Sequence, residues 1–254
     1  MYFYENHAIA DKDYFSFGNL SEPFPAHMHR AFELICVREG SLNLQIDQKE
    51  YILNIGELAI VFPNQIHGFF SDCQFNLSIL IFSPELITEF YQAYKDFVPV
   101  NSVIKMPLWL DFAELKCIYS KMGALYLLCG LLLSDTEIEA ASSHANKTVL
   151  QKVFSYISHH YAENCSLKYV AEALNYDYSY LSRLFSKYTG IGFTEYLNNY
   201  RIFRACSMLE KNELTISEIA FHSGYTSLRT FHRNFRKVMH CSPQNYISSK
   251  VITS

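Results

Sequence analysis

Paired cysteines and long apolar runs are both missing from this sequence. The seven cysteines are scattered, odd in number and without a Cys-x-x-Cys pair, which argues against a disulfide framework and a structural zinc site. The N-terminus lacks the basic region and apolar core of a signal peptide. The longest apolar run, around residues 124–133, is far too short to cross a bilayer. We therefore expect a soluble protein of the reducing cytoplasm.

Positive charge is scarce, and it is unevenly distributed. The net charge is −4, but residues 1–147 hold 9 Lys and Arg against 18 Asp and Glu, whereas residues 148–254 hold 12 against 7. A chain of 254 residues, half of them apolar, is long enough for two globular domains with separate cores. Only the C-terminal half is expected to approach phosphate, with specific contacts carrying more of the binding than bulk attraction.

What is present is a helix-turn-helix pattern in residues 215–246. Thr215 and Glu218 have the spacing of a capping box, so a short helix should follow. Gly224 supplies a turn where positive φ is needed. A second helix, capped by Thr226 or Ser227, then runs to about residue 239.

Two faces are predicted for this second helix. At about 100° per residue, one arc holds the apolar residues Leu228, Phe231, Phe235, Val238 and Met239. The opposite face holds the basic residues Arg229, Arg233, Arg236 and Lys237. A buried first helix, a glycine turn and a basic second helix are typical of helix-turn-helix DNA binding. The alternative is an ordinary helical hairpin with a solvated charged face.

The same pattern occurs upstream, in residues 166–190. In this copy Ser166 corresponds to Thr215, Ala171 to Ala220, Asn175-Tyr176 to Gly224-Tyr225, and Arg183-x-Phe185 to Arg233-x-Phe235. Internal repetition of this kind argues for two copies of one unit. Between the copies, residues 193–209 have the apolar periodicity of a long helix, which would set their separation.

DNA contacts are expected from the outer faces of the second helices of both copies. The predicted DNA-binding residues are Ser179, Ser182, Arg183, Lys187, Leu228, Arg229, Thr230, His232, Arg233 and Arg236. Arg229 and Arg233 are placed in the major groove, because an arginine can donate two hydrogen bonds to a guanine edge.

These residues resemble the AraC/XylS family of bacterial transcription regulators. The signature covers roughly the last hundred residues and includes Arg183-Leu-Phe185, Thr189-Gly190, Arg201-Ile202, Ile216-Ser-Glu-Ile-Ala220, Gly224-Tyr225 and Ser242-Pro243. The resemblance implies a DNA-binding activator that works with RNA polymerase, forms a homodimer and responds to a small-molecule effector, for which sugars are a frequent class. One departure is His240, where the family usually has a glycine at the end of the second recognition helix.

The N-terminal part is predicted to be a small antiparallel barrel or jelly roll. Short strands are expected over residues 31–37, 42–46, 50–54, 58–62 and 75–82, with turns between them and no intervening helices. The fold class is therefore α+β in two domains, a cupin-like barrel with flanking helices followed by an all-α double helix-turn-helix.

Polar residues within these strands resemble the two cupin motifs. The first motif is His27-x-His29-x3-Glu33-x6-Gly40, and the second is Gly56-x6-Pro63-x3-His67, which is one residue short and lacks the usual glycine. The predicted effector-binding residues are His27, His29, Glu33, Arg38 and His67. We expect an organic effector here and neither a metal nor another cofactor, although three nitrogens and one oxygen would also suit a divalent metal.

Helices are expected to flank the barrel. One begins at Ser83-Pro84-Glu85 and runs to about residue 97. Residues 111–134 form one or two apolar helices, which either pack on their own barrel or pair two subunits. The predicted domains are residues 1–135 for effector binding and dimerisation and 148–254 for DNA binding, joined by a linker at 136–147.

The leading functional hypothesis is a ligand-responsive transcription regulator and not an enzyme. The first alternative is a cupin metalloenzyme that uses His27, His29, Glu33 and His67, but it leaves the repeated helix-turn-helix unexplained. The second is a regulator whose barrel serves only for dimerisation.

Overall fold

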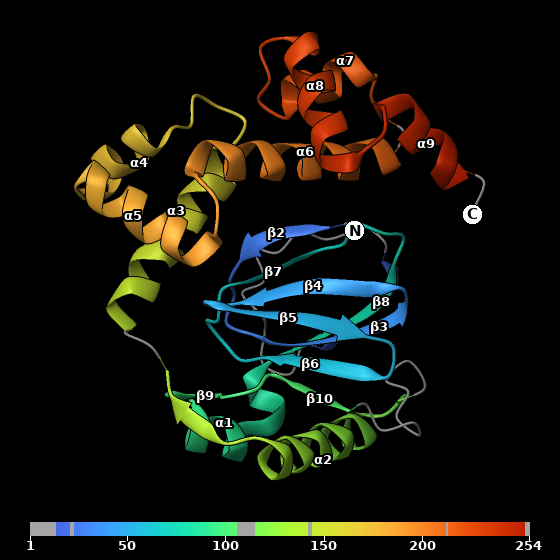
Figure 1. The fold of residues 1–254 in the computed structure, drawn as a ribbon, viewed down its shortest axis with the longest axis vertical. Coiled ribbons are helices and arrows are strands. Elements are labelled where there is room, and N and C mark those ends of the chain that lie inside the picture. Colours follow the sequence, from blue (N-terminus) through green and yellow to red (C-terminus); the bar gives the residue numbers. More distant parts are fainter. Residues whose placement is uncertain (1–13, 21–22, 106–114, 142–143, 212, 252–254) are drawn as a thin grey trace. The chain divides into compact units, whose positions relative to one another are not determined.

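The computed structural model describes residues 14–20, 23–105, 115–141, 144–211 and 213–251. The chain divides between Lys147 and Thr148 into two compact units, the N-terminal unit and the C-terminal unit (Figure 1). Among the described helices, none is long and apolar enough to cross a membrane. A sheet-rich N-terminal unit and a helical C-terminal unit agree with the predicted two-domain α+β organisation.

The N-terminal unit is built on two antiparallel sheets. The five-stranded sheet has the order β1 (Tyr14–Leu20), β8 (Asn76–Phe82), β3 (Phe32–Glu39), β6 (Glu57–Val61) and β10 (Val103–Lys105). The four-stranded sheet has the order β2 (Phe24–His27), β7 (His67–Phe70), β4 (Ser41–Ile46) and β5 (Lys49–Asn54). The five predicted strands correspond to β3, β4, β5, β6 and β8, whereas β1, β2, β7 and β10 were not predicted.

The described strands form separate sheets that no hydrogen-bonded ladder closes into a barrel. The barrel or jelly-roll detail of the prediction is therefore not confirmed. The core between the sheets explains the strand patterns. In β4, Leu42, Leu44 and Ile46 are buried and alternate with partly exposed polar residues, as expected when one face of a strand packs inward.

Strand β3 is buried on both faces. Ile35 and Val37 pack into the core between the two sheets, while Phe32 and Leu34 pack into a second core under the helices. Burial on both faces explains why β3 is almost continuously apolar. Because side chains alternate along a strand, Glu33 lies on the same face as Ile35, the face that points between the sheets.

Helices cover the outer face of the five-stranded sheet. They are the 3₁₀ helix η1 (Pro84–Ile87), α1 (Thr88–Tyr94) and α2 (Ile118–Asp135). From α2, Ala124, Leu125, Leu128 and Leu132 are buried against this sheet. The helix predicted to reach residue 97 ends earlier, because β9 (Phe97–Pro99) begins there. Residues 111–114 of the other predicted helix lie outside the described part of the chain.

The described part of the predicted linker, residues 136–141 and 144–147, is structured, and residues 142–143 lie outside the described part of the chain. Residues 138–140 form β11 (Ile138–Ala140), which pairs with β9, and α3 (His144–His160) begins four residues later. Lys147, in the first turns of α3, is buried and donates to Asp47 at 3.1 Å, so the end of the predicted linker is anchored within the N-terminal unit. Pairing with a distant strand, which composition does not reveal, orders this segment.

The C-terminal unit contains the two predicted helix-turn-helix copies. The first consists of α4 (Leu167–Leu174) and α5 (Tyr178–Thr189), and the second of α7 (Ile216–His222) and α8 (Leu228–Met239). The helix predicted between them is α6 (Phe193–Lys211), and α9 (Pro243–Val251) follows the second copy. Phe154 of α3, Phe185 and Tyr196 form an aromatic cluster under the first copy.

Candidate DNA-binding surface and effector-binding unit

The second helix-turn-helix is fixed by the local signals that the sequence shows. Thr215 and Glu218 form a complete capping box at the start of α7, with the Thr215 backbone N–H donating to the Glu218 carboxylate at 2.8 Å. Gly224 has φ of 83°, as predicted for the turn. Phe231 and Phe235 of α8 are fully buried, so the opposite face of α8 is turned outward.

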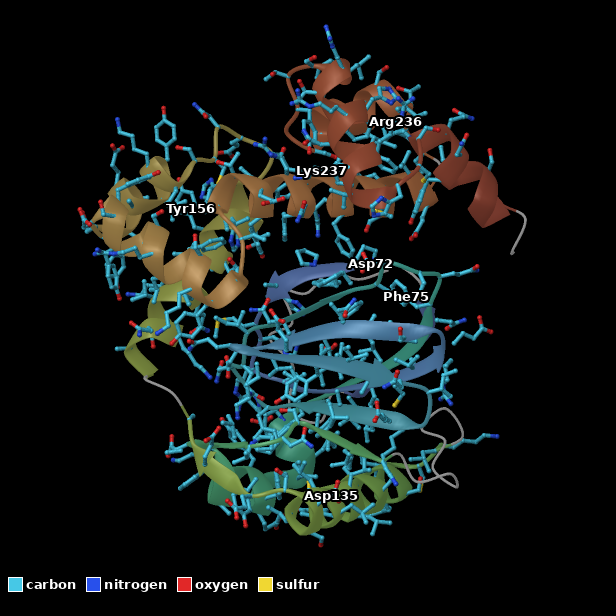
Figure 2. The ribbon with its side chains drawn as sticks, viewed as in Figure 1. Asp72, Phe75, Asp135, Tyr156, Arg236 and Lys237 are labelled. Carbon is cyan, nitrogen blue, oxygen red and sulfur yellow. The ribbon has the colours of Figure 1, made fainter. Side chains whose placement is uncertain are left out.

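That outward face of α8 carries arginines available to a partner. Arg229, Arg233 and Arg236 are exposed, and none has an ion-pair or hydrogen-bond partner among the described residues. Lys237 differs, since its ammonium donates to Glu195 of α6 at 2.7 Å. Arg236 and Lys237 both lie on α8 (Figure 2). A row of unpaired guanidinium groups on one helix face can bind phosphates or base edges.

Three further residues of α8 were predicted to contact DNA, and two of them are less exposed than the arginines. Thr230 and His232 are half-buried beside the arginines. Leu228 was predicted to share the buried arc, but its side chain is 37% exposed. It is the first residue of α8, so it lies at the helix end next to the turn.

The first helix-turn-helix presents a weaker version of the same surface. Ser166 and Asp177 cap α4 and α5, and Asn175 supplies the left-handed turn residue with φ of 56°. Ser179, Arg183 and Lys187 are exposed on α5, while Ser182 is half-buried. This copy therefore offers fewer positive charges than α8.

A polar contact that the sequence analysis missed joins the loop between α3 and the first copy to the second copy. The Arg201 guanidinium of α6 donates to the backbone carbonyls of Tyr161 and Glu163 at 2.8 and 2.9 Å, and it also lies over the ring of Tyr225. Burial raises the pKa of Tyr225. Through Arg201, the loop after α3 is connected to the turn of the second copy. In the sequence analysis, Arg201 was noted only as part of the family signature, without this contact.

In the N-terminal unit, the structure brings together four of the five predicted effector residues. His27 ends β2, His29 follows it, Glu33 lies in β3 and His67 begins β7. One ligand atom from each residue lies within 4.8 Å of the others. Arg38 is separate, because it is exposed and donates to the Ser78 hydroxyl at 3.0 Å.

The cluster is buried and its hydrogen bonds are specific. The Glu33 carboxylate oxygen Oε2 lies 3.0 Å from His29 Nε2 and 3.2 Å from His67 Nε2. Burial lowers the pKa of His27 and of His29. Burial alone would raise the pKa of Glu33, but the neighbouring His67 and His29 outweigh it and hold that pKa well below its usual range.

A polar cavity adjoins this cluster. It has a volume of about 240 Å³ and is lined by residues of β4, β5, β9 and β11 and of the segments between strands, including Asp47, Lys49, Tyr51, Gln65 and Glu139. The Tyr51 hydroxyl is buried and has no hydrogen-bond partner among the described residues. Gln65 links the cavity to the cluster, since its side chain donates to Asp47 at 3.0 Å and its backbone carbonyl accepts from His67 at 3.0 Å. No motif in the sequence pointed to these residues.

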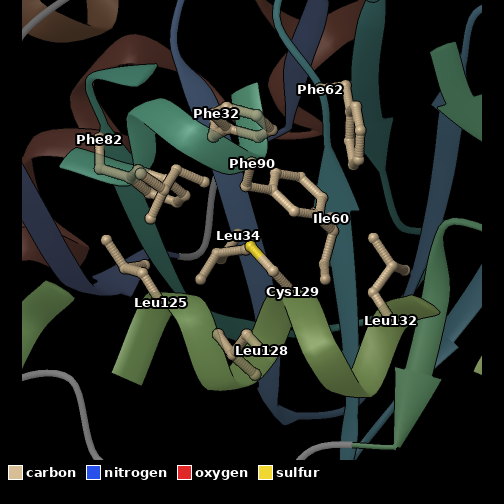
Figure 3. Close-up of a pocket in the computed structure, with 11 residues that line it drawn as sticks. Phe32, Leu34, Ile60, Phe62, Phe82, Phe90, Leu125, Leu128, Cys129 and Leu132 are labelled. Carbon is tan, nitrogen blue, oxygen red and sulfur yellow. The ribbon is translucent and has the colours of Figure 1, made fainter. Parts of the chain in front are cut away.

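A second space lies between the five-stranded sheet and its helices. It is lined only by apolar side chains and Cys129, among them Phe32, Phe90 and Leu128 (Figure 3). Its volume is about 10 Å³, which is about the space that a single water molecule needs. In this conformation the apolar space does not admit an organic ligand.

Family models match both units of the chain. A model described as the AraC-like ligand binding domain matches residues 15–118, and a helix-turn-helix domain model matches residues 170–249. The chain belongs to the AraC family. The resemblance drawn from the C-terminal signature is thereby confirmed, and an AraC-type regulator with a ligand-binding domain is the architecture.

The curated relatives that this AraC-family chain matches are longer than the chain. The chain is 31% identical over 132 residues to the uncharacterized HTH-type transcriptional regulator SAS0078 of Staphylococcus aureus, covering 50% of this chain and 18% of that protein. It is 30% identical over 114 residues to the regulator YtdP of Bacillus subtilis, covering 45% of this chain and 15% of that protein. The chain thus spans less than a fifth of the length of these relatives.

The fold is similar to that of ToxT from Vibrio cholerae. A ToxT structure with a bound unsaturated fatty acid has a TM-score of 0.58 and 14% identity, with 96% of this chain and 97% of ToxT covered. At this identity the likeness shows the fold alone.

Proposed function

We propose that this AraC-family protein is a sequence-specific DNA-binding transcription regulator, and that α5 and α8 are its recognition helices. The exposed, unpaired arginines of α8, backed by the buried Phe231 and Phe235, carry the proposal. A helix anchored by aromatic side chains can hold Arg229 and Arg233 in a fixed direction toward base edges. A regulatory role accounts for the repeated helix-turn-helix, which an enzyme would not need.

Binding to selected DNA tests this proposal. A binding site is selected from random duplexes, and the affinities of wild type and Arg233→Ala are compared on that site and on a scrambled one. Loss of a base contact should weaken specific binding by about 1–3 kcal/mol and relax the base preference at one position. Arg229→Ala should cost more than Ser182→Ala, because α8 carries more charge than α5.

Lys95→Ala provides the control, since it removes one exposed positive charge from the N-terminal unit. It should leave specific binding unchanged. Equal losses for Arg233→Ala on the selected and scrambled duplexes would show that Arg233 contacts only phosphate.

The effector in this proposal is a small polar molecule, with sugars as the first class to test. The adjoining cavity supports this choice, because it combines the Tyr51 hydroxyl with charged and amide side chains. Its volume of about 240 Å³ is just below the range of about 300–1,000 Å³ usual for ligand pockets, which favours a small ligand. The fatty acid named for ToxT would need an apolar channel, and the apolar space here is nearly filled.

A thermal-shift panel of sugars and fatty acids distinguishes these classes. A sugar that raises the unfolding midpoint of wild type and of Tyr119→Phe, but not of Tyr51→Phe, supports the polar cavity. Tyr119 serves as the control because its ring is 82% exposed on α2. Stabilisation by a fatty acid that survives Tyr51→Phe would rule out the cavity. A hit whose affinity survives replacement of both His27 and His67 would show that the cluster takes no part in effector binding.

The proposal also includes dimerisation through α2 and activation through RNA polymerase. One face of α2 is buried in its own unit, which satisfies the first of the two predicted alternatives. The other face exposes Leu127 and Leu131 beside Gly123 and Gly130. Nothing lies within 4 Å of the position that a Cβ atom would take at either glycine. An exposed apolar helix face flanked by glycines fits a second copy of the same helix.

A further inference from the structure

The polar cavity contains a carboxylate whose position is fixed independently of its cation. Asp47 lies in the turn between β4 and β5 with φ of 54°, and its backbone N–H donates to the carbonyl of Ile66 at 2.6 Å. The Asp47 carboxylate accepts from the Gln65 side chain at 3.0 Å and from the Ile66 backbone N–H at 3.1 Å. Gln65 is held in turn, because its side-chain oxygen accepts from the Phe62 backbone N–H at 2.9 Å. Asp47 would therefore keep its place if its cation left.

The cation at Asp47 is held by that one carboxylate. Lys147 is buried, and its ammonium donates to Asp47 at 3.1 Å. Among the described residues, Asp47 is the only ion-pair partner of this ammonium. A buried ammonium without a carboxylate is strongly unfavourable. A competing cation at Asp47 would therefore release Lys147 to solvent, which its flexible four-carbon stem permits.

The cavity combines this carboxylate with an unused hydroxyl. Asp47 and Tyr51 both line it. The Tyr51 hydroxyl is buried without a hydrogen-bond partner among the described residues, and it can both donate and accept. Lys49 and Glu139 also line the cavity, but they pair with each other at 2.7 Å and each is nearly half exposed. The Asp47 side chain is 15% exposed, so its attraction for a ligand cation is less screened by water.

We propose that the effector is an amino sugar whose ammonium group replaces Lys147 at Asp47 while a hydroxyl binds Tyr51. This inference rests on the proposed effector cavity. A neutral sugar would satisfy Tyr51 but leave the Asp47–Lys147 pair intact, since a hydroxyl carries no charge with which to compete against an ammonium. Two ammonium groups on one desolvated carboxylate would leave a buried charge unpaired, so the ligand and Lys147 exclude each other.

Displacement of Lys147 acts on a helix that belongs to both units. Lys147 lies in the first turns of α3 and is the last residue of the N-terminal unit. Helix α3 continues into the C-terminal unit, where Phe154 packs against Phe185 of the first helix-turn-helix. The Asp47–Lys147 pair anchors the start of α3, and the amino sugar frees it. The effector thus has a route from the cavity to α3.

Calorimetry on the full chain tests the ligand class. The probes are glucosamine, galactosamine and mannosamine, each compared with its parent sugar and with its uncharged N-acetyl derivative. At least one amino sugar should bind about tenfold more tightly than its two counterparts, the difference expected between a charge-assisted and a neutral hydrogen bond. Asp47→Asn should remove this preference, and asparagine tolerates the left-handed conformation at that position.

A variant of Lys147 separates competition from simple packing. Lys147→Ala leaves Asp47 open, so the amino sugar should bind about tenfold more tightly than to the wild type, because no cation has to be displaced. Lys152→Ala is the matched control, since Lys152 is an exposed lysine of the same helix. Its affinity should be that of the wild type. Unchanged or weaker binding to folded Lys147→Ala overturns the proposed competition.

Hydrogen exchange of the wild type provides a measurement that needs no variant. The amino sugar should speed the exchange of amides in residues 144–151, and the parent sugar at the same concentration should leave it unchanged. Equal exchange with and without the bound amino sugar overturns the release of Lys147.

The ligand class and the cavity fail separately. If no amino sugar binds more tightly than its parent sugar, the amino-sugar proposal is wrong. A neutral sugar that stabilises the wild type but not Tyr51→Phe would in that case still support the proposed effector cavity. None of these measurements involves DNA, so the regulator proposal is tested independently.

Discussion

Gly224 has a backbone conformation and surroundings that both exclude a side chain. Its φ is 83°, and a Cβ atom would lie 2.7 Å from the carbonyl oxygen of Tyr161 and 2.8 Å from the Cα of Ala162. Both neighbours are backbone atoms, so they cannot rotate away. The loop after α3 can therefore approach the turn of the second helix-turn-helix only because residue 224 is glycine.

Gly224→Ala should destabilise the protein by about 2–4 kcal/mol, since it adds strain at positive φ to a backbone clash. Chemical unfolding of the full chain measures this effect. The control is Gly192→Ala, because nothing lies within 4 Å of the position where its Cβ would be. A change below about 1 kcal/mol is expected there. Equal effects at the two sites would contradict the packing argument.

The ends of α5 and α8 differ by a residue that the family comparison singled out. Gly190 ends α5 with φ of 73°, whereas His240 ends α8 with φ of 56°. Both residues have the left-handed backbone conformation, so α8 ends in the same way as α5 although histidine replaces the usual glycine. A side chain in this conformation carries a steric cost that glycine does not.

His240→Gly should therefore stabilise the protein by about 1 kcal/mol, and Gly190→His should destabilise it by a similar amount. The midpoints of urea unfolding for the two variants measure the difference. A loss of stability in His240→Gly would show that the imidazole makes a contact worth more than the strain.

At the scale of the element, α8 and α5 have the same shape and different surfaces. Both bury an aromatic anchor, Phe235 and Phe185, against α6 or its neighbours. Only α8 presents three arginines without partners among the described residues. The second copy is thus expected to supply most of the base-specific contacts. The first copy is expected to contact phosphates and so to fix the orientation of the unit on the duplex.

Helix α2 has one buried face and one exposed apolar face, and the exposed face leads to a prediction. Leu127→Arg should dissociate the dimer, because it places a charge at the centre of the exposed stripe. Leu127 is 45% exposed, so the fold of the subunit should survive. Sedimentation measures the oligomeric state. Ile52→Arg, at a 67% exposed site on β5, is the control and should remain dimeric. A wild-type chain that is monomeric at all concentrations would refute pairing through α2.

At the scale of the molecule, one chain carries two recognition helices joined by α6. With 19 residues, α6 is about 28 Å long. Successive major grooves on one face of a duplex are about 34 Å apart, so one C-terminal unit is expected to reach both. The site of one subunit should then be non-palindromic, and a dimer should bind two such half-sites.

Fragment 148–254 should therefore protect one contiguous stretch of about two helical turns of DNA. This fragment corresponds to the compact C-terminal unit. Hydroxyl-radical footprinting on the selected site makes the measurement, with Arg233→Ala as the matched variant that loses the half contacted by α8. Protection of a single turn, or specific protection that requires a second fragment, would contradict the model of one chain in two grooves.

The sequence by itself determined the C-terminal unit almost completely. Capping residues such as Thr215 and Ser166, the turn at Gly224 and the periodicity of α8 act within a few residues of one another. Local signals of this kind specify helices and their ends before any tertiary contact forms. The motif histidines and Glu33 were also identified, through the resemblance of the sequence around them to the two cupin motifs.

Only the tertiary structure decided how the N-terminal unit is assembled. Strand β2 was not predicted, and it contains Pro25. The proline is tolerated there because β2 is an edge strand. Gly68 in β7 permits the close approach of β2, since a Cβ there would lie 2.7 Å from the backbone nitrogen of Ala26. Pairing between β2 and β7 sets His27 opposite His67. The meeting of these residues with Glu33 depends on contacts between distant segments, which no local pattern encodes.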